Sequence, residues 1–270
     1  MLECVINISE GRNLKLLSEL RASAGASIRD LHSDEFHNRS VFTLINDPEP
    51  LIRDVHALIT ASYDALDLRL HDGVHPRFGV VDVVPFVALE PQDRAEAGQW
   101  RDRTAQWISE TFAVPTFLYG SLDDVTRTLP EVRRRAFDSL LPDFGPSSAS
   151  PKLGAVAVGA RPILVAWNIW LSGVSRDETR ALAKSVRRGE VRSLAFRAGE
   201  YTQVSCNLIE PLVVGPSVVY DEVASLLPVG GEIVRAELVG LVPRAVLDAE
   251  EPSRWDELGL GENQTIESRL

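Results

Sequence analysis

The chain has 270 residues, of which 44% are hydrophobic and 25% charged, and its net charge is −11. This composition is typical of a globular protein with room for one large or two smaller domains. The negative charge argues against nucleic acid or an anionic membrane as a partner, since both need a positive surface. No apolar run is long enough to cross a bilayer. We therefore expect a cytoplasmic protein that acts on small molecules.

Strand and helix patterns alternate through the first half of the chain. Apolar residues 2–8 predict an opening strand, and Asn13 predicts the cap of a helix with apolar residues at helical spacing. Pro48 and Pro50 predict the first turn of a second helix. Further strands are predicted over residues 26–31, 40–45, 80–87 and 115–119, and a further helix over residues 92–112.

Residues 142–154 interrupt this alternation. Three prolines and two glycines in this stretch exclude a helix or a central strand. Beyond it, Ser175 and Glu178 predict a capping box that opens a helix. Strands are predicted over residues 155–158, 163–171, 191–196, 201–209 and 232–239, and helices over residues 175–188 and 217–227.

These elements predict an α/β (α+β) fold of two subdomains, residues 1–160 and residues 161–270. We expect each to hold a mixed β-sheet with helices packed on its outer face. The proline- and glycine-rich stretch falls near the boundary, and such interfaces are favoured places for a ligand cleft.

The most informative motif is residues 70–79, which holds two histidines and an arginine between glycines. It leads directly into the apolar strand predicted over residues 80–87. Pro76 fixes its own φ and pushes His75 toward an extended backbone. We therefore expect His75 at the end of a strand, on a loop fixed by the scaffold, where a proton-transferring side chain is useful.

Four of the five histidines fall in two short segments. They could be separate polar loop residues, or one of them could perform acid–base catalysis. They could also join in a metal site with an aspartate (His32, Asp34, His37, His71 and His75). The last two are four positions apart on a glycine-containing loop rather than on a helix, so we expect no metal.

Basic residues that could meet an anionic small molecule are Arg39, Arg77, Lys152 and the run 133–135. The triple arginine is better explained as a solvated helix face, since surface charge runs usually mean no more. Asp82 lies inside an apolar strand, where a buried carboxylate needs a partner.

Taken in chain order, these motifs resemble glutamate formiminotransferase, a folate-dependent family. Residues 3–11 are similar to its Glu-Cys-Val-Pro-Asn-Phe-Ser-Glu-Gly opening, and residues 73–86 to its Gly-Glu-His-Pro-Arg-Met-Gly-Ala-Leu-Asp-Val-Cys-Pro-Phe motif. The resemblance continues through residues 38–43, 143–146, 159–161, 203–208 and 238–243, and residues 258–270 look like the last helix of the family.

The resemblance implies two subdomains with a folate tunnel between them, usually in a homodimer. It implies transfer of a formimino group between N-formimino-L-glutamate and tetrahydrofolate as co-substrate, with His75 as the catalytic histidine. The implied folate-binding residues are Gly145, Pro146, Ser147, Ser148, Ala149, Ser150, Pro151, Lys152, Leu153 and Gly154.

Other residues are expected to bind substrate or support the site. Arg77 suits a carboxylate of glutamate or folate, or else it forms an ion pair with Asp82 or another acid that braces the loop. The remaining members of this group are Asn38, Arg39, His32, His37, Asp82 and Asn207.

The chain differs from the family pattern at His32, at residues 34–37, at Val74 and at Leu153. Two alternatives therefore remain open. One is a homologue that binds a folate-like anion with another acceptor or without catalysis. The other is a metal-dependent hydrolase that uses His32, His37, His71 and His75.

Overall fold

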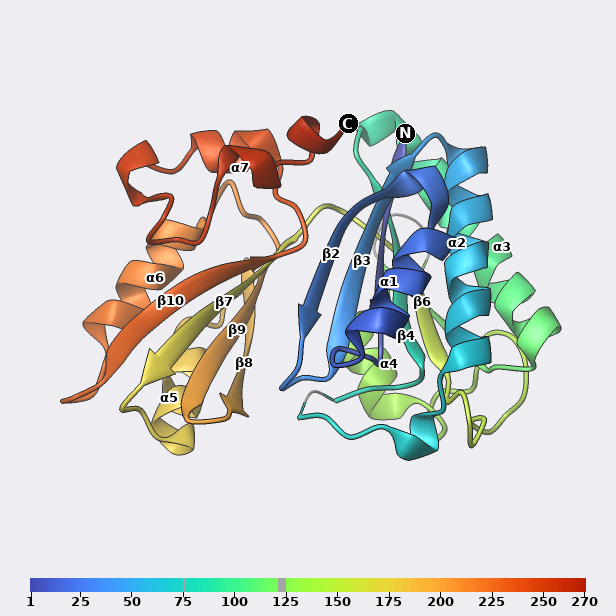
Figure 1. Cartoon of the computed structure of the whole chain (residues 1–270), viewed down its shortest axis with the longest axis horizontal. Helices are drawn as coiled ribbons and strands as arrows, with labels where there is room; N and C mark the ends of the chain where they lie inside the picture. Colours follow the sequence, from blue (N-terminus) through green and yellow to red (C-terminus); the bar gives the residue numbers. More distant parts are fainter. Residues whose placement is uncertain (75, 121–124) are drawn as a thin grey trace. The chain divides into compact units, whose positions relative to one another are not determined.

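A computed structural model describes residues 1–74, 76–120 and 125–270 of the chain (Figure 1). Its contacts divide the chain into two compact units, Met1–Ile163 and Leu164–Leu270. Each unit has its own β-sheet and its own hydrophobic core. Among the described residues, no helix has both the length and the apolar character needed to span a membrane.

The first unit is built on a six-stranded sheet in the order β2-β3-β1-β4-β6-β5. The first four strands in this order pair antiparallel, whereas β4, β6 and β5 pair parallel. The sheet is therefore mixed, as predicted. Its strands are β1 (Leu2–Ile8), β2 (Ile28–Asp34), β3 (Arg39–Asn46), β4 (Val81–Ala88), β5 (Thr116–Gly120) and β6 (Val156–Arg161).

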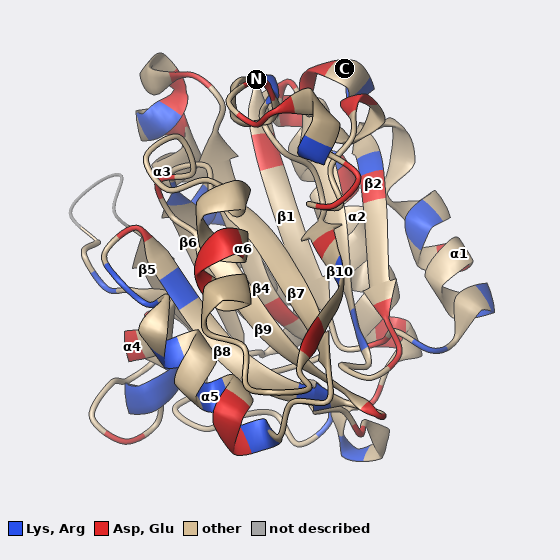
Figure 2. Ribbon diagram, turned by 90° about the vertical axis from the view of Figure 1, so that its left-hand side faces the viewer, with Lys and Arg blue, Asp and Glu red and all other residues tan. Residues whose placement is uncertain are grey.

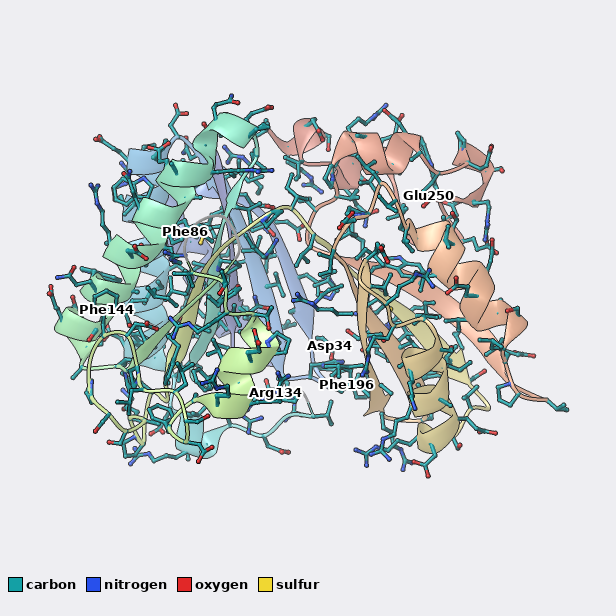
Figure 3. All side chains as sticks on the ribbon, turned by 180° about the vertical axis from the view of Figure 1, so that it is seen from behind. Asp34, Phe86, Arg134, Phe144, Phe196 and Glu250 are labelled. Carbon is teal, nitrogen blue, oxygen red and sulfur yellow. The ribbon has the colours of Figure 1, made fainter. Side chains whose placement is uncertain are left out.

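Three helices cover one face of this sheet: α1 (Leu14–Ser23), α2 (Pro48–Ala65) and α3 (Arg94–Phe112). Alternation along each strand decides which side chains meet them. The even-numbered residues of β1, from Leu2 to Ile8, enter this core together with Phe86 of β4, which Figure 3 labels. Odd-numbered positions of β1, such as Glu3 and Asn7, lie on the opposite face.

The opposite face carries a second, smaller core under the short helix α4 (Leu129–Arg135). Val132 of α4 packs there against a group that includes Phe117 and Tyr119 of β5. A capping box fixes the start of the helix, since the Thr128 side chain accepts from the Glu131 amide and the Glu131 side chain accepts from the Thr128 amide. Polar side chains of β1, β3 and β4 lie on this same face.

The second unit is a four-stranded sheet in the order β10-β7-β9-β8. Its strands are β7 (Val165–Ser172), β8 (Val191–Ala198), β9 (Tyr201–Leu208) and β10 (Glu232–Val239), and its helices are α5 (Arg176–Ser185), α6 (Pro216–Ser225) and α7 (Arg244–Asp248). Trp167 is fully buried in this core, and its indole N–H donates to the Leu258 carbonyl at 2.8 Å.

The predicted α/β class with two sheets is confirmed, and two details differ. Every described pairing in the second sheet is antiparallel. For β8 and β9 this follows from the two-residue connection between them, which permits no other direction. Residues 258–270 form short 3-10 turns rather than a helix. Gly259 has a φ of +64°, which lies outside the right-handed helical region, so a continuous helix cannot pass through it.

Candidate functional site

The loop of residues 71–80 contains the two histidines and the arginine of the most informative sequence motif. It runs from the 3-10 turn Leu68–Leu70 into β4, and it is described except for His75. The predicted catalytic position therefore lies outside the described residues. Ser9, just beyond β1, donates from its hydroxyl to the Gly79 carbonyl at 2.7 Å and from its amide to the Val80 carbonyl at 2.8 Å. These bonds hold the end of the loop against a central strand of the sheet.

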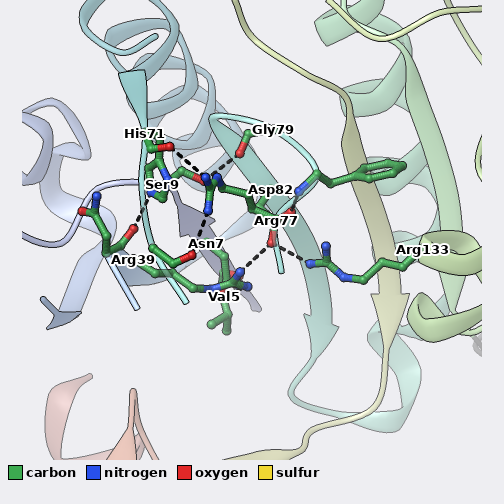
Figure 4. Close-up of polar contacts among 12 residues, drawn as sticks. Val5, Asn7, Ser9, Arg39, His71, Arg77, Gly79, Asp82 and Arg133 are labelled. Atoms are coloured by element: carbon green, nitrogen blue, oxygen red, sulfur yellow. Dashed lines mark hydrogen bonds and ion pairs between the residues drawn. The ribbon is translucent and has the colours of Figure 1, made fainter. Parts of the chain in front are cut away.

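Arg77 folds back onto the start of the same loop. Its guanidinium donates to the carbonyl oxygens of His71 at 2.8 Å and of Gly73 at 3.2 Å (Figure 4). Among the described residues, these carbonyls are the hydrogen-bond acceptors of Arg77. Arg77 therefore braces the loop through backbone carbonyl oxygens. From the sequence, such a brace was one of two expectations, but through an ion pair with an acid.

The imidazole of His71 is bonded to the backbone of Asn38. Its Nε2 lies 2.7 Å from the Asn38 carbonyl oxygen, which can only accept, so this nitrogen carries the proton. Burial lowers the pKa of His71 below its ordinary value, and the nearby positive charge of Arg77 adds to this effect, while the bond to the carbonyl opposes it. Its Nδ1 is buried and has no hydrogen-bond partner within the described part of the chain.

Asn38 joins the two histidine segments. It has a φ of +46°, which places its short polar side chain in a left-handed turn between β2 and β3. The side-chain amide donates to the Asp72 carbonyl at 2.8 Å, and the side-chain oxygen accepts from the Gly11 amide at 2.9 Å. The two histidine segments therefore meet at Asn38, His71 and Asp72.

Asp82 is fully buried and is surrounded by donors. One carboxylate oxygen accepts from the Phe78 amide at 2.5 Å. The other accepts from two guanidinium groups, those of Arg39 and Arg133, both at 2.6 Å (Figure 4). Arg39 in turn donates twice to the Asn7 side-chain oxygen, at 2.9 and 3.1 Å. The expectation that Asp82 needs a partner is met by these two arginines.

The proline- and glycine-rich segment adjoins the histidine loop. The Val80 amide donates to the Leu153 carbonyl at 2.9 Å, and the Ala155 amide donates to the Phe78 carbonyl at 3.0 Å. A Cβ on Gly154, whose φ is +77°, would lie 2.5 Å from the Phe78 carbonyl oxygen. Only a glycine at position 154 allows these two segments of the chain to approach this closely.

The end of this segment is a tight turn, and its middle is exposed to solvent. Ser150 and Gly154 exchange backbone hydrogen bonds at 2.9 and 2.7 Å. The Lys152 ammonium lies 3.3 Å from the Tyr63 carbonyl and is exposed. Residues 146–149 are also exposed, so this stretch is accessible in the first unit.

The remaining histidines take up different surroundings. His37 is buried, with its amide bonded to the Asp34 carboxylate at 2.8 Å and its Nε2 4.0 Å from the same carboxylate. His32 lies within β2, opposite Val41 of β3. No group of three or more His, Cys, Asp or Glu side chains is placed to hold a metal ion in residues 1–74, 76–120 and 125–270.

Asn207 belongs to the second unit. It is exposed on β9, in register with Ala166 of β7 and Arg192 of β8. Among the predicted residues of the first unit, the structure joins Asn38 to the loop that Arg77 braces, and it joins Arg39 to Asp82. Asn207, by contrast, belongs to the second unit.

Sequence reasoning missed two members of the site, Asn7 and Ser9, and it named a third, Arg133, only as part of the basic run 133–135. The first two fall in the opening motif, where their position at the end of a strand could have identified them. Arg133 was hidden within a run of three arginines.

Comparisons with known proteins show which family the chain resembles. The family described as "Formiminotransferase domain, N-terminal subdomain" matches residues 1–161. A protein named glutamate formimidoyltransferase from Thermoplasma acidophilum is 30% identical over 92% of the chain and 89% of its own length. Another of that name from Streptococcus pyogenes is 29% identical over 93% of the chain and 92% of its own length.

A longer relative is the formimidoyltransferase-cyclodeaminase of Sus scrofa, which is 32% identical over 92% of the chain. The match covers 51% of that protein, so the chain spans about half the length of such relatives.

Proposed function

The chain belongs to the formiminotransferase family, and from this premise we propose that it transfers a formimino group between N-formimino-L-glutamate and tetrahydrofolate. The relatives that match over most of their length carry names for this reaction. The substrates of the proposed reaction are small molecules, and one of them, the folate, serves as co-substrate.

One structural observation supports the proposal independently of the names of the relatives. The loop that contains the His-Pro-Arg motif is hydrogen-bonded directly to the segment implied in folate binding, through Val80 to Leu153 and Ala155 to Phe78. The two segments lie far apart in the sequence, and close packing at Gly79 and Gly154 keeps them together. This adjacency supports a single site that holds the folate beside the acid–base group.

We assign general acid–base catalysis to His75. In the transfer, the folate amine attacks the formimino carbon and gives a tetrahedral intermediate, and the bond from that carbon to the glutamate nitrogen then breaks. The attacking nitrogen loses a proton and the leaving nitrogen gains one. An imidazole with an ordinary pKa near 6.5 can accept the first proton and return the second. Such a positioned group contributes about 10²–10⁴-fold in rate.

The surrounding residues are proposed to position this loop. Arg77 braces its start, Asn38 ties it to the turn after β2, and Asp82 holds Phe78 near its end. His32 and His37 are proposed as supporting residues on the neighbouring strand and turn. The folate would contact residues 145–154, of which residues 145–149 and 151–152 are exposed.

We propose that the chain forms a homodimer, as the family resemblance implies, that it holds no resident metal, and that it acts in the cytoplasm. Light scattering of the purified chain tests the dimer, and a mass near 30 kDa would contradict it.

The test of the proposed reaction is turnover by the wild-type chain. Tetrahydrofolate and N-formimino-L-glutamate are supplied, and released L-glutamate is measured against the folate converted. We expect equal amounts of the two. Saturable binding of 5-formyltetrahydrofolate without any release of glutamate would instead support the anion-binding alternative.

A further inference from the structure

The three consecutive arginines of α4 have different surroundings. Arg133 turns toward the sheet, where its side chain is 21% exposed and bonds to Asp82. Arg134, which is labelled in Figure 3, is exposed. Arg135 is also exposed, and its Nε donates to the Ser139 hydroxyl at 3.2 Å. Figure 2 shows the basic residues that gather on this helix. Only the first of the three faces the site.

The guanidinium groups of Arg39 and Arg133 share the carboxylate of Asp82. A single carboxylate oxygen receives both Arg39 and Arg133, and its other oxygen is occupied by the Phe78 amide. The crowding affects Arg39: burial lowers the pKa of its guanidinium, Asp82 opposes this, and the nearby charge of Arg133 adds to it. A second anion would relieve the repulsion between the two guanidinium groups.

Arg133 is the member of this pair with donors to spare. The Nη2 atom of Arg133 donates to the Asp82 carboxylate. Among the described residues, Asp82 is the hydrogen-bonding partner of Arg133. A guanidinium has five N–H donors in a rigid planar fork, so its remaining edge can bind a carboxylate in bidentate fashion. The bond to Asp82 fixes the fork in advance, which lowers the entropic cost of binding.

We propose that Arg133 binds a carboxylate of a substrate, oriented for this purpose by Asp82. The inference rests on the proposed function, which supplies carboxylates from the glutamate substrate and from the glutamate tail of the folate. Asp82 bonds both to Arg133 and to Phe78, which follows His75 by three positions in the sequence. The same carboxylate therefore positions the anion-binding group and the end of the catalytic loop. Arg133 is a specificity-determining residue in this scheme.

Calorimetry with two stable ligands tests the inference without turnover. N-formyl-L-glutamate stands in for the formimino amino acid, with an oxygen in place of the imino nitrogen, and 5-formyltetrahydrofolate represents the folate. Both are titrated into wild type, Arg133→Gln and the matched neighbour Arg134→Gln. We expect Arg133→Gln to weaken one ligand by about 10-fold or more, about 1.4 kcal/mol. Arg134→Gln should stay within about 2-fold of wild type for both ligands, since an isolated exposed charge contributes little.

The ligand that is weakened identifies the source of the carboxylate. If Arg133→Gln binds both ligands as tightly as wild type does, the inference is overturned and the proposed function is unaffected. Failure of the wild type to bind either ligand would overturn the proposed function and this inference with it. Arg133→Lys keeps a charge beside Asp82 if the glutamine variant does not fold. We expect it to weaken the same ligand by about 3-fold or more, because an ammonium lacks the planar fork, and unchanged affinity would count against the inference.

Discussion

Replacing Asp82 by asparagine should destabilise the first unit strongly. The side chain is about the same size, so the change removes charge and replaces an acceptor oxygen with a donor. Asp82 is 0% exposed, and the described residues donate three hydrogen bonds to it, two of them from the guanidinium groups of Arg39 and Arg133. In the variant, these two positive charges face each other without a carboxylate between them.

Removing one partner of a buried ion pair costs about 3–5 kcal/mol, a large part of the 5–15 kcal/mol that is typical of a whole domain. Urea unfolding of the full chain, followed by circular dichroism, measures this loss. With a slope of about 1–3 kcal/mol per molar urea, the midpoint of the first unit should fall by more than about 1 M.

The matched control is Glu19→Gln on α1. Glu19 is 60% exposed and lies 3.9 Å from Lys15 in a surface pair, so its loss should change stability by about 0.5 kcal/mol or less. A loss below about 1 kcal/mol for Asp82→Asn, similar to the control, would refute the view that Asp82 anchors the site.

Three further changes test other parts of the account. Gly154→Ala should cost about 1–3 kcal/mol from its positive φ, with more from the clash with the Phe78 carbonyl, and it should weaken 5-formyltetrahydrofolate binding. Gly189→Ala, where a Cβ meets nothing within 4 Å, should be nearly neutral, and equal losses in the two variants would contradict the close packing. Burial raises the pKa of Glu3 from 4.5 to about 7, so the folded chain holds a proton that the unfolded chain releases, and stability falls as pH rises from 4.5 to 7. Glu3→Gln should therefore be more stable than wild type at pH 8, by up to about 3 kcal/mol at 1.36 kcal/mol per pH unit. A difference between the two proteins that is the same at pH 4.5 and pH 8 would contradict this. Thr128→Ala removes the capping box of α4 and should cost about 0.5–2 kcal/mol, measured in the same unfolding assay, and no loss would count against the cap.

Local chemistry was sufficient to predict most elements from the sequence. The capping box at Ser175 and Glu178 begins α5 as expected, and Pro48 occupies the first turn of α2. Apolar runs bounded by polar residues located the central strands β1 and β4. These signals are contained within a few residues, so they do not depend on the rest of the fold.

The site was less predictable because it depends on contacts between distant segments. Asp82 needed a partner, and nothing in the sequence says that the partners are Arg39 and Arg133, which lie 43 and 51 positions away. The run of arginines in α4 presents three directions, about 100° apart. Which of them faces the sheet is decided by Val132, whose packing against Phe117 and Tyr119 fixes the rotation of the helix.

The identity of the neighbours of Arg77 also depended on tertiary structure. From the sequence, a carboxylate was the natural partner for a guanidinium, whereas the folded loop offers it the carbonyls of His71 and Gly73. Backbone acceptors carry no sequence signature. The role of His75 stays a prediction.

The most direct test of the central claim is the turnover number of His75→Ala beside that of wild type, with folate binding measured on the same samples. If His75 is the acid–base group of a formiminotransferase, wild type transfers the formimino group and kcat falls about 10²–10⁴-fold in the variant. The affinity for 5-formyltetrahydrofolate should stay within about 3-fold, because the change removes a proton carrier and leaves the implied folate segment intact. A kcat in His75→Ala within a few-fold of wild type would contradict the account.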